Sequence, residues 1–340
     1  MLESRAVDAK RTGSGGPRRA LSRFAAGGGA AWLALAALAL VCSLSSPVFA
    51  RPANLLNVAR QSSYTGLVAL GMTFVVVAGG IDLSVGSLFA FSGVAAAQLL
   101  SALPGAAGGG AAFAAACAAL CAALGAAGGA VNGALVAAGR LPPFIATLGT
   151  YSLFRSLSLW LADSGSVPSP GWDNAVTRFG QAAPLGVPSP VWILLALAAA
   201  LGVALSRTPW GRHAVAAGAG ERVARFAGVR VGRVRFATYV LAGALAGLSA
   251  FLALGRLGTL SSSNAGLFFE LDAIAAVVIG GASMSGGRAS VSGTLAGAFV
   301  LGVLSNALQL WGVDPSLQGA VKGLAIVLSV LVQRRAAAAA

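Results

Sequence analysis

The sequence is poor in the residues that carry out chemistry. Among 340 residues there is one histidine, Asp and Glu together number nine, and charged residues of both signs make up only 9% of the chain. No catalytic triad, metal cluster or carboxylate pair can be drawn from so few scattered groups. The two lysines, Lys10 and Lys322, stand in no GxxxxGK[ST] pattern, so the chain has no P-loop for ATP. We therefore expect a protein that is not an enzyme and binds no cofactor itself.

The three cysteines do not point to a redox or metal site. Cys42, Cys117 and Cys121 all lie in apolar runs, and their odd number gives no disulfide framework. Cys117 and Cys121 are one helical turn apart, but a metal would need further ligands, and His213 is distant in the sequence. We expect all three to act as small apolar side chains.

Apolar residues are what the chain has in abundance. They make up 57% of it and the mean hydropathy is +0.84, which is too apolar for a water-soluble fold of this length. Runs of roughly 20 residues can cross a bilayer as helices. We expect an all-α membrane protein, a polytopic bundle of about 8–10 transmembrane helices. The apolar runs lie near residues 28–46, 63–79, 86–103, 111–138, 144–162, 190–206, 236–255, 270–285, 290–311 and 316–332.

The net charge of +14 is concentrated in segments between the apolar runs. Because no basic face with aromatic partners is present, we expect no nucleic-acid partner. The basic segments are residues 1–24, residues 207–235 and the pair Arg334 and Arg335. By the positive-inside rule these lie in the cytoplasm, which an even number of spans allows for both termini. We expect a multi-pass membrane protein with cytoplasmic N- and C-termini.

Three segments follow from this topology. Residues 1–24, rich in Arg, Gly and Ser, are expected to form a disordered cytoplasmic tail whose charges favour anionic membrane lipid. Residues 25–335 form the transmembrane domain, which includes the cytoplasmic loop 207–235, and residues 336–340 are a C-terminal tail. The first apolar run has a poor small-residue cleavage site, so we expect it to be kept as a helix.

Alanine and glycine dominate the spans. Glycines four residues apart, such as Gly125 with Gly129 and Gly243 with Gly247, recur along the chain. Small residues at this spacing let helices approach closely, which predicts a tightly packed bundle.

The most informative segment is GGIDLSVGS at Gly79–Ser87, where a carboxylate stands between long apolar runs. Ionisable residues inside a membrane are costly and mark candidate functional sites. Asp82 or Ser84 is expected to cap the helix that starts near residue 85, or to lock the structure locally. The alternative is direct contact with a transported solute.

A second segment is similar to this one. Val76–Gly86 reads VVAGGIDLSVG, and Val277–Gly287 reads VVIGGASMSGG. Both interrupt an apolar run with glycines, as the broken helices of transporters do beside a cavity. We treat the pair as a candidate internal repeat, with a chance echo in a glycine-rich chain as the alternative.

Together these motifs resemble those of a known family. GGIDLSVGS occurs with ALGMT at Ala69–Thr73, PPFIATLG at Pro142–Gly149 and ELDAIAAVVIGG at Glu270–Gly281, in the family's order, over roughly residues 30–335. The chain resembles the membrane-spanning permease subunit of the ribose/xylose/galactose-type family of bacterial ABC importers.

The resemblance implies an importer that moves a monosaccharide or similar small polar solute into the cytoplasm by alternating access. It implies a homodimer or pseudodimer of permeases, cytoplasmic ABC ATPase subunits that bind ATP and Mg²⁺, and a periplasmic or lipoprotein solute-binding protein. The alternatives are an ABC permease for a non-sugar solute such as a nucleoside, and an ion-coupled secondary transporter with Asp82 as its ion site.

The basic loop is the expected contact for the ATPase. Glu221–Phe226 is predicted to form a short helix, and the family's pattern G-x-N-x-x-A-A-x-x-S-G-I is matched there in part. The resemblance implies that this loop couples the permease to the ATPase, with the arginines meeting an acidic or polar groove on the ATPase. The residues given this role are Glu221, Arg222, Arg225 and Gly228. The alternative is a loop that is basic only because it is cytoplasmic.

Other polar residues in the apolar runs are further candidates. Glu270 and Asp272 begin an apolar run, where negative charge stabilises a helix N-terminus; a gate or docking role near the outer surface is the alternative. Amides within spans hydrogen-bond between helices or line a polar path. The candidates for the translocation path or its structural signature are Asp82, Ser84, Asn132 and Asn306.

Overall fold

The computed structural model describes residues 28–102, 109–169 and 175–338. The expected N-terminal tail, residues 1–24, lies outside these ranges. The elements in chain order are α3 (Gly29–Ser45), α4 (Pro52–Val77), α5 (Val85–Ser101), α6 (Ala111–Ala137), α7 (Pro143–Leu161), β1 (Ser166–Pro168), α8 (Ala175–Gln181), η2 (Pro184–Gly186), α9 (Ser189–Arg207), α10 (Pro209–Ala219), α11 (Glu221–Phe226), α12 (Val231–Leu257), β2 (Thr259–Ser261), α13 (Phe269–Ile279), α14 (Val291–Leu310) and α15 (Pro315–Ala338).

Each predicted apolar run contains a helix, and α4, α12, α13 and α15 differ from the predicted runs in their bounds. Helix α4 begins at Pro52, well before the apolar run near 63–79, because its first half carries polar residues such as Arg60 and Gln61 that lower the local hydropathy. Helix α13 ends at Ile279, although the run continues to 285, because a glycine turn stops it. The short helix predicted at Glu221–Phe226 is confirmed as α11.

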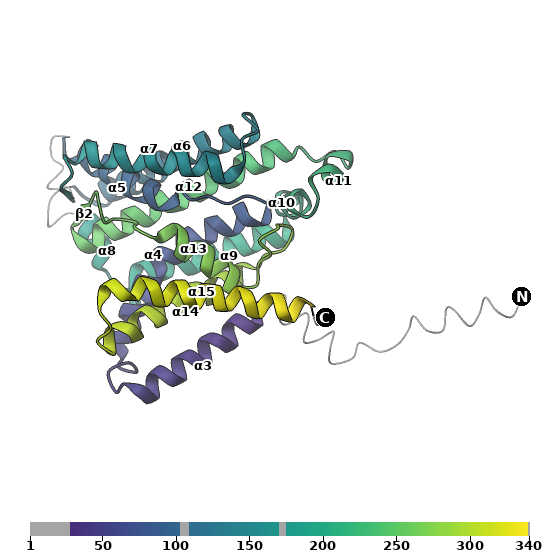
Figure 1. The fold of residues 1–340 in the computed structure, drawn as a ribbon. Helices are drawn as coiled ribbons and strands as arrows, with labels where there is room; N and C mark the ends of the chain where they lie inside the picture. The colour runs from purple at the N-terminus through teal and green to yellow at the C-terminus, as the bar shows by residue number, and fades with distance from the viewer. Residues whose placement is uncertain (1–27, 103–108, 170–174, 339–340) are drawn as a thin grey trace, which may run out of the picture.

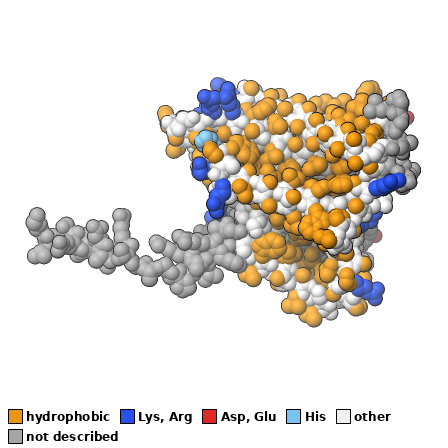
Figure 2. Space-filling model, turned by 180° about the vertical axis from the view of Figure 1, so that it is seen from behind, with side chains coloured by type: hydrophobic (Ala, Val, Ile, Leu, Met, Phe, Trp, Pro, Cys, Tyr) orange, Lys and Arg blue, Asp and Glu red, His pale blue; other side chains and the backbone are white. Residues whose placement is uncertain are grey.

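The surface and composition of the bundle are those of a multi-pass membrane protein. Among the described residues, four helices are long and apolar enough to cross a membrane, namely α6, α9, α12 and α14, and α3 and α5 are shorter apolar helices. Large apolar side chains are exposed on α3, α7, α9 and α15. Figure 2 shows hydrophobic side chains across the middle of one face and Lys and Arg toward its edges. An all-α polytopic bundle is therefore confirmed.

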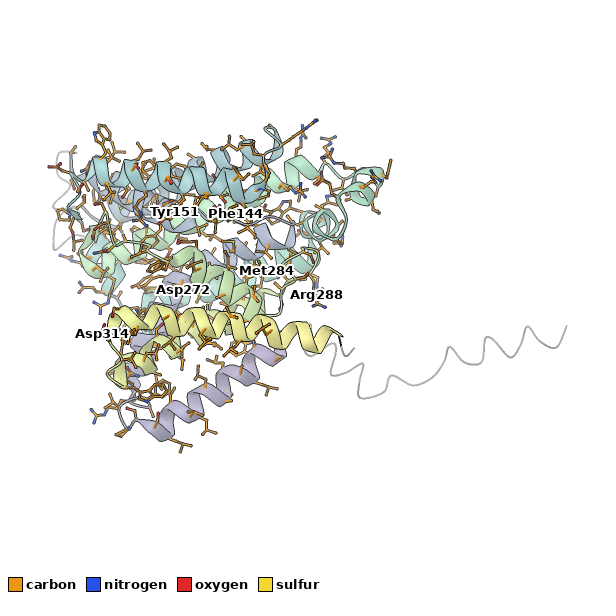
Figure 3. All side chains as sticks on the ribbon, viewed as in Figure 1. Phe144, Tyr151, Asp272, Met284, Arg288 and Asp314 are labelled. Atoms are coloured by element: carbon orange, nitrogen blue, oxygen red, sulfur yellow. The ribbon has the colours of Figure 1, made fainter. Side chains whose placement is uncertain are left out.

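The bundle has two distinct ends. One end, called here the α10 end, carries α10 and α11 together with the start of α3 and the end of α15, so both ends of the described chain lie there (Figure 1). The opposite end carries α8 and a small antiparallel pair in which β1 joins β2, with Val167 opposite Leu260. Figure 3 places Arg288 toward the α10 end and Asp314 at the opposite end.

Helix α12 forms the centre of the bundle and packs most closely on α6. Its residues Tyr239, Ala246 and Leu252 are almost completely buried. Backbone meets backbone where the glycines of the two helices face each other: a Cβ atom on Gly125 would lie 2.1 Å from the carbonyl oxygen of Gly243. The predicted close packing of small residues is thus confirmed within one chain.

The two segments of the candidate repeat form the same kind of turn. Helix α4 is closed by Gly79 in the left-handed conformation, and α13 by Gly281, with φ angles of 80° and 89°. In each turn the next amide bonds back to the last helical turn, Gly80 N to Val75 O and Ala282 N to Val277 O. This is the Schellman geometry that glycine favours. Gly79 therefore corresponds to Gly281 in structure, whereas in the sequence match it corresponds to the residue before Gly281.

The α6–α12 contact yields a stability test. We expect Gly125→Val to lower the thermal unfolding temperature of the purified protein, because the added atoms overlap the α12 backbone and overpacking costs about 1–3 kcal/mol. Gly149→Val on α7 is the matched control, since a Cβ there meets nothing within 4 Å. Equal melting of the two variants would contradict the packing described.

Candidate functional site

A buried polar cluster surrounds Asp82, in the break between α4 and α5. The carboxylate is fully buried and its Oδ1 accepts hydrogen bonds from the backbone N and the Oγ of Ser84, at 2.8 and 2.7 Å. Asn132 of α6 donates from Nδ2 to Ser84 Oγ at 2.6 Å and lies 3.4 Å from both carboxylate oxygens. The structure brings together three of the four residues predicted for the path or its signature.

Neighbouring helices complete this cluster. Thr150 of α7 donates to Asn132 Oδ1 at 2.6 Å. Tyr239 of α12 donates its hydroxyl to the backbone oxygen of Ile81 at 3.2 Å. The cluster therefore joins the break to α6, α7 and α12. Neither the Asp82 nor the Ser84 side chain accepts from a backbone N–H of the first turn of α5, so these side chains lock helices together and do not cap α5.

Asn306, the fourth predicted residue, lies elsewhere. Its amide forms a reciprocal pair with Asn54, in which each Nδ2 donates to the other's Oδ1 at 2.9 Å. The pair joins α14 to α4, which is one of the two arrangements expected for an amide in a membrane helix.

Glu270 lies inside the bundle and is 8% exposed. It stands in the first turn of α13, and its Oε2 packs against the first turn of α5, where a Cβ on Gly86 would lie 2.3 Å from it. Oε2 has no hydrogen-bond partner among the described residues. Two helix N-termini thus face one carboxylate, the arrangement in which negative charge stabilises both helix dipoles.

A cavity of about 430 Å³ lies among α4, α12, α13, α14 and α15. This size falls in the range of small-molecule sites, roughly 300–1,000 Å³. Polar side chains in its lining include Asn57, Arg60, Gln61, Tyr64, Arg256 and Lys322. Asp272 also lines it, and its carboxylate accepts from Lys322 Nζ at 3.1 Å, so α13 and α15 are joined by an ion pair across the cavity wall. Figure 3 shows Asp272 between the two ends of the bundle.

Helix α11 projects from the α10 end and carries the residues predicted to couple to an ATPase. Glu221 accepts from Arg225 Nη2 at 2.6 Å on its own helix and pairs with Arg235 Nη1 of α12 at 2.8 Å. Partial burial alone would raise the pKa of Glu221, but the hydrogen bond from Arg225 and the charge of Arg235 hold that pKa below its ordinary value. Gly228, with φ 81°, turns the chain after the helix.

Helix α11 also exposes two large apolar side chains beside its arginines. Val223 is 73% exposed and Phe226 is 86% exposed, whereas Arg225 is held by Glu221. Large apolar residues that project into water mark contact sites for other proteins. The sequence interpretation stressed the arginines of this helix and missed its apolar side chains.

Helix α10 lies directly against the end of α4 and against the loop that follows the glycine turn of α13. A Cβ on Gly218 would lie 1.9 Å from the oxygen of Val77 and 2.6 Å from the amide of Gly287, and these two groups are themselves hydrogen-bonded at 2.9 Å. Trp210 stacks on Phe74 of α4 with ring centroids 4.9 Å apart. Arg235 adds a second link, since its Nε donates to the oxygen of Ala78 at 3.3 Å.

Several of these residues were not singled out from the sequence. Arg60 and Lys322 were assigned to flanks or passed over, although basic residues inside a membrane helix are themselves a signal of function. Tyr239, Thr150 and Arg235 give no such signal, because their role depends on which helix lies beside the break after α4.

The Asp82 cluster yields a second test. Asp82→Asn is expected to lower the stability of the protein by about 1–3 kcal/mol, because an amide in place of Oδ2 would face the donor nitrogen of Asn132. Asp163→Asn, in an exposed turn, is the control with the same change of charge. A variant that melts and assembles like the wild type would show that the carboxylate is dispensable.

Comparisons with known proteins agree with the resemblance of the motifs. The chain is 40% identical over 307 residues to the ribose import permease protein RbsC of Bacillus subtilis (strain 168), covering 90% of this chain and 92% of that protein. It is 41% identical to RbsC of Escherichia coli (strain K12), covering 89% and 92%. The L-arabinose transport system permease protein AraH of Escherichia coli (strain K12) is 31% identical over 95% of both chains. No solved structure gives a significant match.

The family assignment follows from these matches and from the fold. Residues 54–330 match the family described as branched-chain amino acid transport system / permease component, which is most of the chain. The matched range contains the two glycine turns and the Asp82 break, which are also structural features that join the helices of the bundle. The chain belongs to this family of membrane permease components.

Proposed function

We propose that the chain is the membrane-spanning subunit of an ATP-driven importer that carries a monosaccharide or similar small polar solute into the cytoplasm. The observation that carries this proposal is the identity of about 40% with ribose import permeases over nearly the full length of both chains. The absence of a P-loop from the sequence supports a division of labour in which ATP and Mg²⁺ are bound by a separate ATPase subunit.

The α10 end is the face proposed to meet the ATPase in the cytoplasm. Its loop 207–235 carries seven arginines against one acidic residue, as the positive-inside rule requires of a cytoplasmic segment. Val223 and Phe226 are exposed apolar side chains that are proposed to insert into a groove on the ATPase. The Glu221–Arg225 pair orders the helix that presents these side chains, with Arg222 exposed beside them and Gly228 turning the chain away.

Two physical links support transmission from α11 into the bundle. Arg235 binds Glu221 on α11 and the end of α4 at Ala78, four residues before the Asp82 cluster. Helix α10, which precedes α11, touches at Gly218 both the end of α4 and the loop after α13. A shift of these two short helices would therefore bear on the end of α4 and on the loop that follows α13, and both α4 and α13 line the cavity.

The cavity is the proposed part of the solute path. Hydroxyl-rich solutes need several hydrogen-bonding side chains, which Asn57, Gln61 and Tyr64 provide on one face of α4. In an alternating-access cycle the cavity would open to the two ends of the bundle in turn. A solute-binding protein would dock at the end opposite α10, and a second copy of the permease would complete the transporter. Asp272, paired with Lys322, is the predicted gate residue that lines this path.

Purification with partner subunits tests both the function and the docking face. The tagged chain, isolated from its own host in mild detergent, is expected to bring down a Walker-A ATPase in stoichiometric amount by mass spectrometry. Phe226→Asp is expected to reduce that yield at least tenfold, because a charge would replace the most exposed apolar side chain of α11.

Leu185→Asp is the matched control, since Leu185 is 91% exposed and lies away from α11 in the segment beside α8. Folded wild-type protein that repeatedly purifies without an ATPase would contradict the importer assignment. An ATPase that binds the Phe226→Asp variant normally would contradict the docking face alone.

A further inference from the structure

The charge of the cavity goes beyond what a neutral sugar requires. Three cationic side chains line it, Arg60, Arg256 and Lys322, and the one carboxylate in the lining is Asp272. Because Asp272 is already paired with Lys322, the two arginines have no counter-charge among the described residues. The lining therefore carries an excess of two positive charges, in a bundle whose face in Figure 2 is largely hydrophobic.

The two arginines also lack hydrogen-bond partners. Neither Arg60 nor Arg256 makes an ion pair within the part of the chain that the structure describes, and Arg60 Nε is buried with no partner there. The hydroxyl of Tyr64 is likewise buried and unpartnered, and the charges of both arginines reach it. Arg60 Nε and the Tyr64 hydroxyl, both on α4, are thus buried without a partner among the described residues, and Arg256 of the facing helix α12 lines the same cavity.

Withdrawing an unpaired charge from water costs more the deeper the charge lies, and Arg60 and Arg256 are both half-buried. Arginine presents a planar fork of donors that fits the two oxygens of a carboxylate or phosphate group. A neutral sugar would satisfy some of these donors but would leave both positive charges uncompensated. An anionic group between Arg60 and Arg256, with Tyr64 donating to it, would compensate them.

We propose that this cavity binds a monosaccharide carrying an acidic group, a carboxylate or a phosphate, which Arg60, Arg256 and Tyr64 hold while Asn57 and Gln61 meet its hydroxyls. This proposal rests on the importer function and names the class of its solute. The Asp272–Lys322 pair lies in the same lining and closes the cavity toward α15.

The test is equilibrium binding to the full-length permease in phosphatidylcholine nanodiscs. Galacturonate and galactose share one ring and differ by a carboxylate in place of a hydroxymethyl group, so their affinities isolate the charge; galactose 6-phosphate serves as the phosphate arm. We expect at least one acidic sugar to bind tenfold or more tightly than galactose. Arg60→Gln and Arg256→Gln should each reduce this preference at least fivefold.

Arg51→Gln is the matched control, because it removes the same charge at the start of the same helix, on an exposed side chain outside the cavity. Equal affinity for galactose and both acidic sugars, or a preference that survives both cavity variants, would overturn the proposal. The same binding measurement is repeated in nanodiscs that contain the anionic lipid phosphatidylglycerol. If the acidic sugar binds in phosphatidylcholine but not in phosphatidylglycerol, the site is one for a lipid headgroup, and the proposal is overturned.

Failure of this proposal is distinguishable from failure of the importer function. A permease that purifies with its ATPase and binds neutral sugars without preference refutes only the charge assignment. A permease that binds galacturonate but never an ATPase refutes the importer and leaves the cavity chemistry standing.

Discussion

Backbone groups freed by a helix break need partners when the chain lies in a membrane, because each unsatisfied group there costs on the order of several kcal/mol. This chain breaks its helices after α4 and after α13, and it pairs several of the freed backbone groups within the protein. Schellman turns close the helix ends, Tyr239 and Arg235 donate to carbonyls of the first break, and Gly287 of the second break bonds to Val77 at the first. The two breaks are therefore one structural unit.

That unit gives the proposed transport cycle a mechanical basis. Helix α10 is in backbone contact with the unit at Gly218, while the Asp82 cluster ties the same unit to α6, α7 and α12. Interfaces packed this tightly move as bodies and do not deform gradually. A displacement at α11 is proposed to reach the cavity through this contact, with the Asp82 lock keeping the break after α4 intact while the helices around it move.

Much of this fold could be predicted from the sequence, since runs of about 20 apolar residues specify membrane helices by length and composition alone. The Glu221–Arg225 spacing and the paired glycines were also local signals, and α11 and the two turns lie where those signals placed them. The partners of Asp82 were predicted only in part, because the approach of Asn132 and Thr150 depends on how distant helices pack. Arg60 lies outside the apolar run predicted near 63–79, because the polar first half of α4 lowers the local hydropathy.

The measurement that tests this account most directly is solute uptake per ATP hydrolysed in proteoliposomes that hold the complete transporter, compared between Gly218→Ala and Gly220→Ala. A Cβ at Gly218 overlaps Val77 and Gly287, whereas a Cβ at Gly220 meets atoms no closer than 3.9 Å. If α10 transmits ATPase motion through the glycine turns, Gly218→Ala will hydrolyse ATP with uptake reduced at least fivefold, and Gly220→Ala will behave as wild type. Equal uptake per ATP in both variants would contradict that claim.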